Sequence, residues 1–158
     1  MIKNKKDDKY FMKQAIKEAE KARKKEEVPI GAVLVLEDKI ISRGHNLRET
    51  KTNPLYHAEI IAVDKASKKL KKWRLRGTKL YVTIEPCPMC IGAAINARIK
   101  EVVYGAPDPK AGACKSIMNI PFNKKLNHKV KVKKGILEKE CREIIQKFFK
   151  ELRKKGKK

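Results

Sequence analysis

Residues 79–98, KLYVTIEPCPMCIGAAINAR, determine the fold, because an apolar strand leads directly into a helix that starts with two cysteines. The run KLYVTI at 79–84 is typical of a buried strand. Pro86 ends this run, and the residues after it predict a helix over 87–98. Cys87 and Cys90 stand three positions apart, so they share a face of its first turn. The positive end of the helix dipole favours thiolate, which is the form of cysteine that binds metal.

A second helix start lies upstream, at His57-Ala58-Glu59. Residues 57–70, HAEIIAVDKASKKL, carry apolar residues at helical spacing. His57 and Glu59 diverge by about 200° around the helix axis, but at a helix start both side chains can still point into one cavity. The gap between the two helices is long enough for a strand, which suits a β-α-β unit. We therefore expect the two helix starts to meet around one metal ion.

One imidazole and two thiolates supply three zinc ligands, and Glu59 is left free to move protons. A catalytic zinc site needs three protein ligands and an open fourth position for water. A Cys-x-x-Cys pair alone could also be a redox dithiol or half of a closed structural zinc site. The redox alternative leaves His57 and Glu59 without a role. The closed site needs further ligands, and Cys114 and Cys141 are isolated from each other. The pattern thus favours a catalytic zinc ion.

Length and composition predict one domain over residues 1–158, with the ends 1–8 and 154–158 flexible and basic. No apolar run is long enough for a transmembrane helix, and the charged N-terminus lacks the apolar stretch of a signal peptide. Four cysteines, two of them in a metal motif, do not make a disulfide framework. We expect a cytoplasmic protein without a membrane partner.

The net charge is +23, which predicts attraction to a polyanion such as nucleic acid. Lysine supplies 33 of the 41 basic residues, so part of the charge can instead reflect a lysine-rich proteome or a hot environment. The distribution is more specific. Residues 124–134 hold six lysines and no acid, and residues 147–158 hold seven basic residues and one acid. This bias predicts a phosphate-binding face near the C-terminus.

The hydrophobic pattern predicts the order α-β-β-α-β-α-β-β-α. A hairpin is expected near residues 37–39, and Thr52 or Asn53 is expected to cap the helix that carries His57. Such an order predicts a mixed sheet with helices on both faces. The expected helices are 10–27, 57–70, 87–98 and 136–153, with a short helical turn at 116–119, and the expected strands are 30–36, one from 40 onward, 79–84, 99–104 and 129–133.

From about Tyr10 to Arg153 the chain resembles bacterial tRNA-specific adenosine deaminases of the cytidine deaminase superfamily. The His-Ala-Glu and Pro-Cys-x-x-Cys elements mark the superfamily. Asp108-x-Lys110-x-Gly112 and the Phe-Phe pair of the last helix point to the tRNA branch. Further matching segments are EVPIGAVLV at 27–35, HN at 45–46, LYVTIEPCPMC at 80–90, YGAPDPKAGA at 104–113, NH at 127–128 and GIL at 135–137.

The resemblance implies an α/β fold, a three-layer α/β/α arrangement of the cytidine deaminase type around a five-stranded mixed sheet. It implies a homodimer with one Zn²⁺ per subunit, held by His57, Cys87 and Cys90. The implied reaction is hydrolytic deamination of adenosine to inosine at the wobble position of tRNA, by zinc-bound hydroxide with Glu59 as the proton shuttle. The tRNA anticodon arm is the implied partner.

The resemblance also assigns substrate contacts. Asn46 would contact the nucleoside, and the backbone N–H of Ala58 would hold the base. The remaining assignments place Pro29 and Gly31 at the pocket floor, Asp108 and Lys110 against the anticodon loop, and Phe148, Phe149 and Arg153 beside the RNA channel. Each has a simpler alternative: Asn46 and Asp108 also suit turns, and one of the two phenylalanines is expected to pack in the core.

Two other functions remain open from the sequence. A deaminase of a free base or nucleoside would use the same zinc chemistry with a different pocket. A basic RNA-binding module with a structural zinc would need four protein ligands. The charge and the tRNA-branch segments argue against the first alternative, and Glu59 argues against the second.

Overall fold

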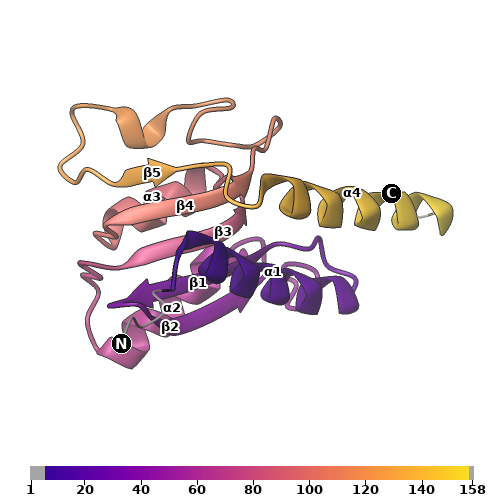
Figure 1. Cartoon of the computed structure of the whole chain (residues 1–158), viewed down its shortest axis with the longest axis horizontal. Coiled ribbons are helices and arrows are strands. Elements are labelled where there is room, and N and C mark those ends of the chain that lie inside the picture. Colours follow the sequence, from indigo (N-terminus) through magenta and orange to yellow (C-terminus); the bar gives the residue numbers. More distant parts are fainter. Residues whose placement is uncertain (1–5, 157–158) are drawn as a thin grey trace, which may run out of the picture.

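The computed structural model describes residues 6–156. Its centre is a five-stranded sheet with the strand order β2-β1-β3-β4-β5 (Figure 1). β1 pairs antiparallel with both β2 and β3, whereas β3, β4 and β5 run parallel. The predicted mixed sheet is therefore confirmed. The strands are β1 (Gly31–Leu36), β2 (Lys39–His45), β3 (Lys79–Ile84), β4 (Glu101–Ala106) and β5 (Lys131–Lys133).

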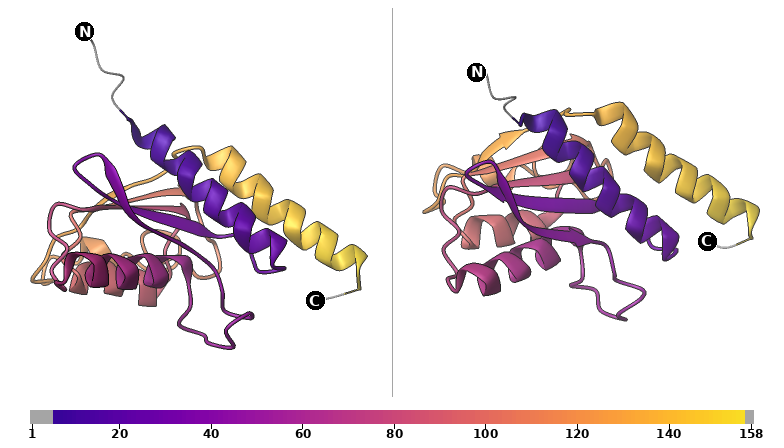
Figure 2. Two further views of the ribbon diagram at one scale, coloured as in Figure 1. Left: turned by 90° about the horizontal axis from the view of Figure 1, so that it is seen from below. Right: turned by 60° about the horizontal axis from the view of Figure 1, so that its bottom comes forward.

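Helices cover both faces of the sheet, which confirms the predicted three layers. In both views of Figure 2, α1 (Asp8–Lys24) and α4 (Glu138–Lys154) lie side by side on one face. The opposite face is covered by α2 (Ala58–Leu70) and α3 (Pro88–Asn96). Among the described residues, no helix is long and apolar enough to cross a membrane.

Successive side chains of each strand point to opposite faces of the sheet, so the core consists of two clusters, one on each face. Val33 and Val35 of β1 pack with Tyr81 in the cluster beneath α1 and α4. Ala32 and Leu34 belong to the cluster beneath α2 and α3. Successive strand residues point to opposite faces, and both faces are covered. The strands therefore read as continuous apolar runs, which is the pattern that predicted them.

The β1–β2 hairpin is tighter than predicted. Glu37 and Asp38 both have positive φ, 50° and 61°, as the two-residue turns favoured in hairpins require. Lys39 therefore already pairs with Leu36, and β2 begins one residue before the expected Ile40. The chain between β2 and α2 also differs from expectation. His57 is the N-cap of α2, while the Asn53 side chain accepts a hydrogen bond from the Leu55 backbone in a preceding turn.

Other predicted boundaries moved because neighbouring elements compete for the same backbone groups. β4 starts at Glu101 instead of residue 99, since Ile99 donates its N–H to Ala94 and closes the end of α3. The short helical turn lies at Ile120–Phe122, not at 116–119. Six further predicted ranges differ by one to three residues at an end, namely the helices 10–27, 57–70, 87–98 and 136–153 and the strands 30–36 and 129–133.

Some residues of the ends that were predicted to be flexible belong to helices or cap them. Asp7 caps α1 by accepting a hydrogen bond from the Tyr10 backbone. Asp8 lies in α1, where its carboxylate accepts hydrogen bonds from Tyr81 and Lys133 at 2.7 and 2.6 Å. Lys154 is the last residue of α4. The rest of that prediction concerns residues 1–5 and 157–158, which lie outside the described residues.

Candidate active site

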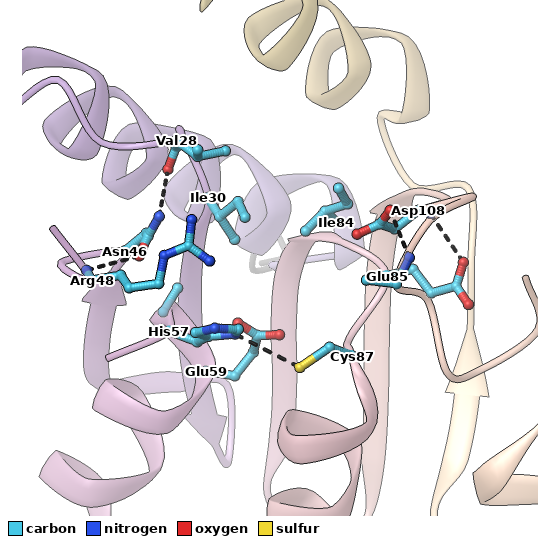
Figure 3. Close-up of a pocket in the computed structure, with 12 residues that line it drawn as sticks. Val28, Ile30, Asn46, Arg48, His57, Glu59, Ile84, Glu85, Cys87 and Asp108 are labelled. Carbon is cyan, nitrogen blue, oxygen red and sulfur yellow. Dashed lines mark hydrogen bonds between the residues drawn. The ribbon is translucent and has the colours of Figure 1, made fainter. Parts of the chain in front are cut away.

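A small pocket opens where β2, β3 and β4 end and β1 begins (Figure 3). The first residues of α2 and the turn into α3 form its inner side. Its volume is about 160 Å³, below the roughly 300–1,000 Å³ typical of sites for drug-sized ligands. A single base fits this scale better than a whole nucleotide. The lining residues are Val28, Ile30, Asn46, Arg48, His57, Ala58, Glu59, Ile84, Glu85, Cys87, Asp108 and Ala111.

His57, Cys87 and Cys90 come together beside this pocket, as the sequence predicted. The His57 Nδ1 atom lies 3.7 Å from the Cys87 sulfur and 3.5 Å from the Cys90 sulfur. All three ligand atoms lie within 4.8 Å of one another. His57 and Cys87 are the N-caps of α2 and α3, yet neither side chain caps its helix. Each of these two ligands thus stands at the first turn of a helix.

The donor set fits a zinc ion. Zinc takes Cys sulfur at about 2.3 Å and His nitrogen at about 2.0–2.1 Å in tetrahedral geometry, which separates nitrogen and sulfur by about 3.5 Å. The observed separations are 3.7 and 3.5 Å. With three protein ligands, one tetrahedral position is left for water or substrate. Among the described residues the group has three donors, which is the number typical of a catalytic zinc site, whereas a closed structural site has four.

The pKa values of the two thiols, Cys87 and Cys90, shift in opposite directions. A hydrogen bond from Cys90, joined by one from His57, lowers the pKa of Cys87 to about 4. The same hydrogen bond to Cys87, together with burial, raises the pKa of Cys90. The hydrogen bond with Cys87 raises the pKa of His57. The low pKa of Cys87 favours its thiolate, which is the form of cysteine that binds a cation.

Glu59 lies beside His57 in the pocket and outside the three-ligand group (Figure 3). Its side chain is buried, with 3% of its surface exposed. Burial raises the pKa of Glu59 to about 7. A carboxyl group with a pKa near the working pH can both accept and donate a proton. The local chemistry therefore suits a general acid and base.

Two predicted substrate contacts, Asn46 and Ala58, line the pocket. The Asn46 amide donates to the Val28 carbonyl at 3.2 Å, and its oxygen accepts from the Arg48 backbone at 3.1 Å. Asn46 is therefore both a turn residue and a pocket residue. Ala58 opens α2, so its N–H is among the first four of the helix, which lack an acceptor within it.

Asp108 also lines the pocket, but Lys110 does not. The Asp108 carboxylate accepts hydrogen bonds from the backbones of Lys110 and Ala111, at 3.1 and 3.2 Å. It thereby starts a turn, as the simpler alternative proposed, while the exposed Lys110 side chain lies outside the pocket lining.

Pro29 and Gly31, which were predicted to shape the pocket floor, are not among the residues that line the pocket. Val28 and Ile30 line the pocket instead. Gly31 faces α1, because a Cβ atom there would lie 2.0 Å from the Ala15 carbonyl oxygen. Neighbouring residues of extended chain point to opposite sides, so a motif matched by sequence does not say which residue faces the pocket.

Phe148, Phe149 and Arg153 do not line the pocket. They lie in the C-terminal half of α4, which extends beyond the ends of the strands (Figure 1). Phe148 is buried, whereas Phe149 is 38% exposed and meets the Phe148 ring edge-on at 5.4 Å. One of the two therefore packs in the interior. Contact of these residues with RNA outside the pocket stays a prediction.

Two charged residues of the pocket lining, Arg48 and Glu85, were not predicted. Arg48 is exposed at the pocket edge, and its charge opposes the rise in the pKa of His57. Nothing in the local pattern distinguishes this arginine from the other basic residues. Glu85 is buried directly after β3. The sequence signal that could have identified Glu85 is an acidic residue placed between an apolar strand and the turn that carries Cys87.

Comparisons with known proteins agree with this geometry. The pattern of the MafB19-like deaminase family matches residues 6–153. The tRNA-specific adenosine deaminase of Bacillus subtilis is 53% identical over 150 residues, which cover 95% of this chain and 93% of that protein. The chain belongs to the tRNA-specific adenosine deaminase family.

Solved structures of two deaminases are similar to the fold of this chain. A tRNA:A34 deaminase, studied for A-to-I editing at the wobble position, superposes with a TM-score of 0.82 and 42% identity over 85% of this chain and 98% of that one. The guanine deaminase of Bacillus subtilis gives a TM-score of 0.59 and 40% identity, over 61% of this chain and 62% of that one. Family membership makes the chain a deaminase with the cytidine deaminase fold.

Proposed function

We propose that the protein hydrolyses adenosine to inosine at the wobble position of tRNA. The observation that carries this proposal is the pocket itself: an open three-ligand group, a buried glutamate with a pKa of about 7, and room for one base. The relative from Bacillus subtilis, 53% identical, is a tRNA-specific adenosine deaminase, which supports adenosine in tRNA as the substrate.

Zinc dependence is part of the proposal, with His57, Cys87 and Cys90 holding one Zn²⁺ per subunit. When bound, zinc polarises water and lowers its pKa to about 7, which makes a nucleophile available at neutral pH. The Glu59 carboxylate takes the proton from this water and delivers it to N1 of adenine as C6 is attacked. Glu59 then carries the proton of the new C6 hydroxyl to the amine, the bond between C6 and that nitrogen breaks, and adenosine and water give inosine and ammonia.

Pocket residues orient the base for this reaction. We propose that the N–H of Ala58 donates to the base and that Asn46 contacts the nucleoside through the amide that it presents at the pocket. Arg48 stands at the pocket edge, where it suits a phosphate of the bound strand. Bases of an anticodon loop are already partly unstacked, so placing one in a small pocket costs less than in a duplex.

RNA binding, assembly and location are proposed on separate grounds. The net charge of +23 supports attraction to the tRNA anticodon arm. A homodimer is supported by apolar side chains exposed on the described surface, since large exposed apolar groups often mark interfaces. These include Leu55, Tyr56, Trp73, Ile117, Met118 and Phe122. Sedimentation at several protein concentrations tests the dimer. A cytoplasmic location stays a prediction.

A second candidate is deamination of free guanine, because a guanine deaminase shares 40% identity over 61% of the chain. A substrate panel separates the two functions. An anticodon stem-loop with wobble adenosine, the same stem-loop with adenosine elsewhere in the loop, and free adenosine, cytidine and guanine are compared by product formation. We expect inosine only in the first RNA. Turnover of a free base or nucleoside with an inert stem-loop would refute the tRNA proposal.

A further inference from the structure

One side of the pocket is a segment without helix or strand. Residues 107–116, here called the pocket wall, follow β4 and contribute Asp108 and Ala111 to the lining. Loops usually lie on the surface and are mobile. This loop instead has buried residues, among them Ala113 and Cys114 with 0% exposure. Something other than regular secondary structure must therefore hold it in place.

Glu85 supplies the main attachment. One oxygen of its carboxylate accepts hydrogen bonds from the backbones of Cys114, Lys115 and Ser116, at 3.1, 2.9 and 3.0 Å. The other oxygen accepts from the Asp108 backbone at 3.1 Å and from the Ser116 hydroxyl. Both ends of the pocket wall thus converge on a single side chain, which Figure 3 shows beside Asp108.

The wall is shaped around this carboxylate. A Cβ atom at Gly112 would lie 2.3 Å from the Glu85 carboxyl carbon, so only glycine fits there without displacement. The Gly112 backbone donates to the Asp108 carbonyl at 2.9 Å, and the Ala113 backbone donates to the Pro86 carbonyl at 2.8 Å. The loop therefore closes over Glu85 and joins the turn that carries Cys87.

Glu85 itself is fixed to the sheet. Its backbone N–H donates to the Ala106 carbonyl at 2.8 Å, which ties the ends of β3 and β4 together. Its side chain is buried, with 1% of the residue exposed. All five hydrogen bonds that its carboxylate accepts come from residues of the wall, so the side chain is committed to the wall and not to a substrate.

An ionised carboxylate matches this environment better than an amide. Five donors point at two oxygens, and hydrogen bonds to a charged acceptor are about twice as strong as neutral ones. In Glu85→Gln, one oxygen would become an NH₂ group that faces N–H donors, which leaves buried donors without an acceptor. The wall would lose its main attachment, whereas the metal ligands and Glu59, which lie at the starts of α2 and α3, would keep their positions.

We propose that Glu85 is a positioning residue, which holds the 107–116 wall so that Asp108 and Ala111 meet the substrate. Its effect on catalysis rests on the proposed function, but its effect on the wall does not. A misplacement of about 1 Å at a substrate-binding surface can cost up to about 100-fold in efficiency. We therefore expect substrate binding to suffer more than the chemical step.

The first test measures the wall directly, on zinc-loaded protein without RNA. In Glu85→Gln the amides of Cys114, Lys115 and Ser116 are expected to exchange hydrogen about tenfold faster or more, because each loses a charged acceptor. Amides of β3 and α2 are expected to be unchanged. The matched control is Glu101→Gln, a partly buried glutamate at the opposite end of the parallel strands that pairs with Lys79.

The second test compares KM with kcat on the anticodon stem-loop. Glu85→Gln is expected to raise KM about 10-fold to 100-fold with kcat within a few-fold of wild type, while Glu101→Gln matches wild type. Gly112→Ala displaces the same carboxylate from the other side and should give the same pattern. Combining Glu85→Gln with Asp108→Ala should add little to the larger single effect, because both act through one wall.

The outcomes separate the two proposals. If wild type does not act on the stem-loop, the proposed function fails, and the exchange test still decides whether Glu85 holds the wall. Unchanged exchange at residues 114–116 in Glu85→Gln would overturn the positioning role. A fall in kcat of about 10-fold to 100-fold in Glu85→Gln, without a rise in KM, would also overturn the positioning role. Loss of zinc or global unfolding in both Glu85→Gln and Gly112→Ala would make Glu85 a folding determinant instead.

Discussion

Single residues at two helix starts determine the chemistry of the pocket. His57 and Cys87 occupy N-cap positions whose usual role is to cap the helix, yet their side chains turn to one another. Glu59 shares the pocket, where burial raises its pKa to about 7. Such an arrangement sets a metal-binding group beside a proton carrier, and each of the two roles can be removed separately.

Cys87→Ala should remove the metal. Of the three donors only two remain, so we expect zinc content, measured by atomic spectroscopy after dialysis, to fall from about one per chain to a small fraction. Zinc ligands are seldom replaceable when the site has only three. Cys141→Ala is the matched control, since Cys141 is a buried cysteine of α4 and lies outside the three-ligand group. Full zinc occupancy in Cys87→Ala would contradict the ligand assignment.

Glu18 makes stability depend on pH. Burial opposes its ionisation, but hydrogen bonds with His45 and Lys21 outweigh burial and lower the pKa of Glu18 to about 2. Because the folded pKa is below the unfolded value, this stabilisation is complete above the unfolded pKa and is lost as pH falls toward 2.

The measurement compares the Tm of wild type and Glu18→Gln between pH 7 and pH 3. We expect wild type to be more stable at pH 7 and the difference to shrink below about pH 4.5. A difference that stays constant over this range would show that the ionised carboxylate is not the stabilising form.

The site residues that the sequence predicted share a rare chemistry. His57, Glu59, Cys87 and Cys90 are residue types that bind metal or carry protons, at a spacing that strongly favours a zinc site, and the structure places them together as expected. Glu85 was missed because its partners lie 23 to 31 residues further along the chain. Its role depends on how the wall folds back, which no local pattern describes.

At the scale of elements, close approach of helix and strand is the main packing device. A Cβ atom at Gly31 would meet the Ala15 carbonyl of α1 at 2.0 Å, and one at Gly44 would meet the Ala58 carbonyl of α2 at 2.4 Å. Two glycines therefore let helices on opposite faces lie directly on the β1–β2 hairpin. The second of these contacts also sets the position of the first turn of α2, beside the pocket.

Gly31→Ala should destabilise the protein. The added methyl group has no space, and such overpacking typically costs about 1–3 kcal/mol. Gly92→Ala is the matched control: nothing lies within 4 Å of a Cβ there, and Gly92 is within α3. Alanine in a helix is about 0.5–1 kcal/mol more favourable than glycine. Urea unfolding of both variants measures the difference, and equal stabilities would contradict the packing of α1 on β1.

Elements with strong local patterns were predicted closely, and elements bounded by long-range contacts were not. The strand at 79–84 matches β3 residue for residue, because an apolar run is followed by Glu85 and Pro86. β4 was predicted two residues early, since the backbone of residues 99 and 100 bonds to Ala94 and Thr78 instead. Which residues of 28–31 face the pocket also depends on a long-range contact. Gly31 packs against α1, and Val28 and Ile30 line the pocket.

For the whole molecule, charge is the dominant feature. A net charge of +23 on 158 residues favours association with any polyanion and makes that association depend on salt. Part of this charge is a general property of the surface. The basic segments at residues 124–134 and 147–155 are the candidates for specific phosphate contacts, and they can be tested against basic residues elsewhere.

Affinity for the anticodon stem-loop should fall steeply with salt. If the protein makes about six phosphate contacts, affinity should drop by roughly 10³-fold between 50 and 200 mM salt. Replacing Lys124, Lys125 and Lys129 with glutamine should reduce the slope of log K against log salt by up to about 0.9 for each lost contact. Lys68, Lys69 and Lys72, at the end of α2 away from the pocket, are the matched control. A slope near zero would contradict phosphate binding.

Deamination of wobble adenosine with Glu59 as the proton carrier can be tested in one experiment. Inosine formation in an anticodon stem-loop with adenosine at the wobble position is measured for zinc-loaded wild type and for Glu59→Gln, with zinc content and Tm determined on both samples. We predict inosine at that position with wild type, and a loss of about 10² to 10⁴ in rate with Glu59→Gln at equal zinc content. Comparable turnover by the zinc-loaded variant, or no inosine with wild type, would contradict this mechanism.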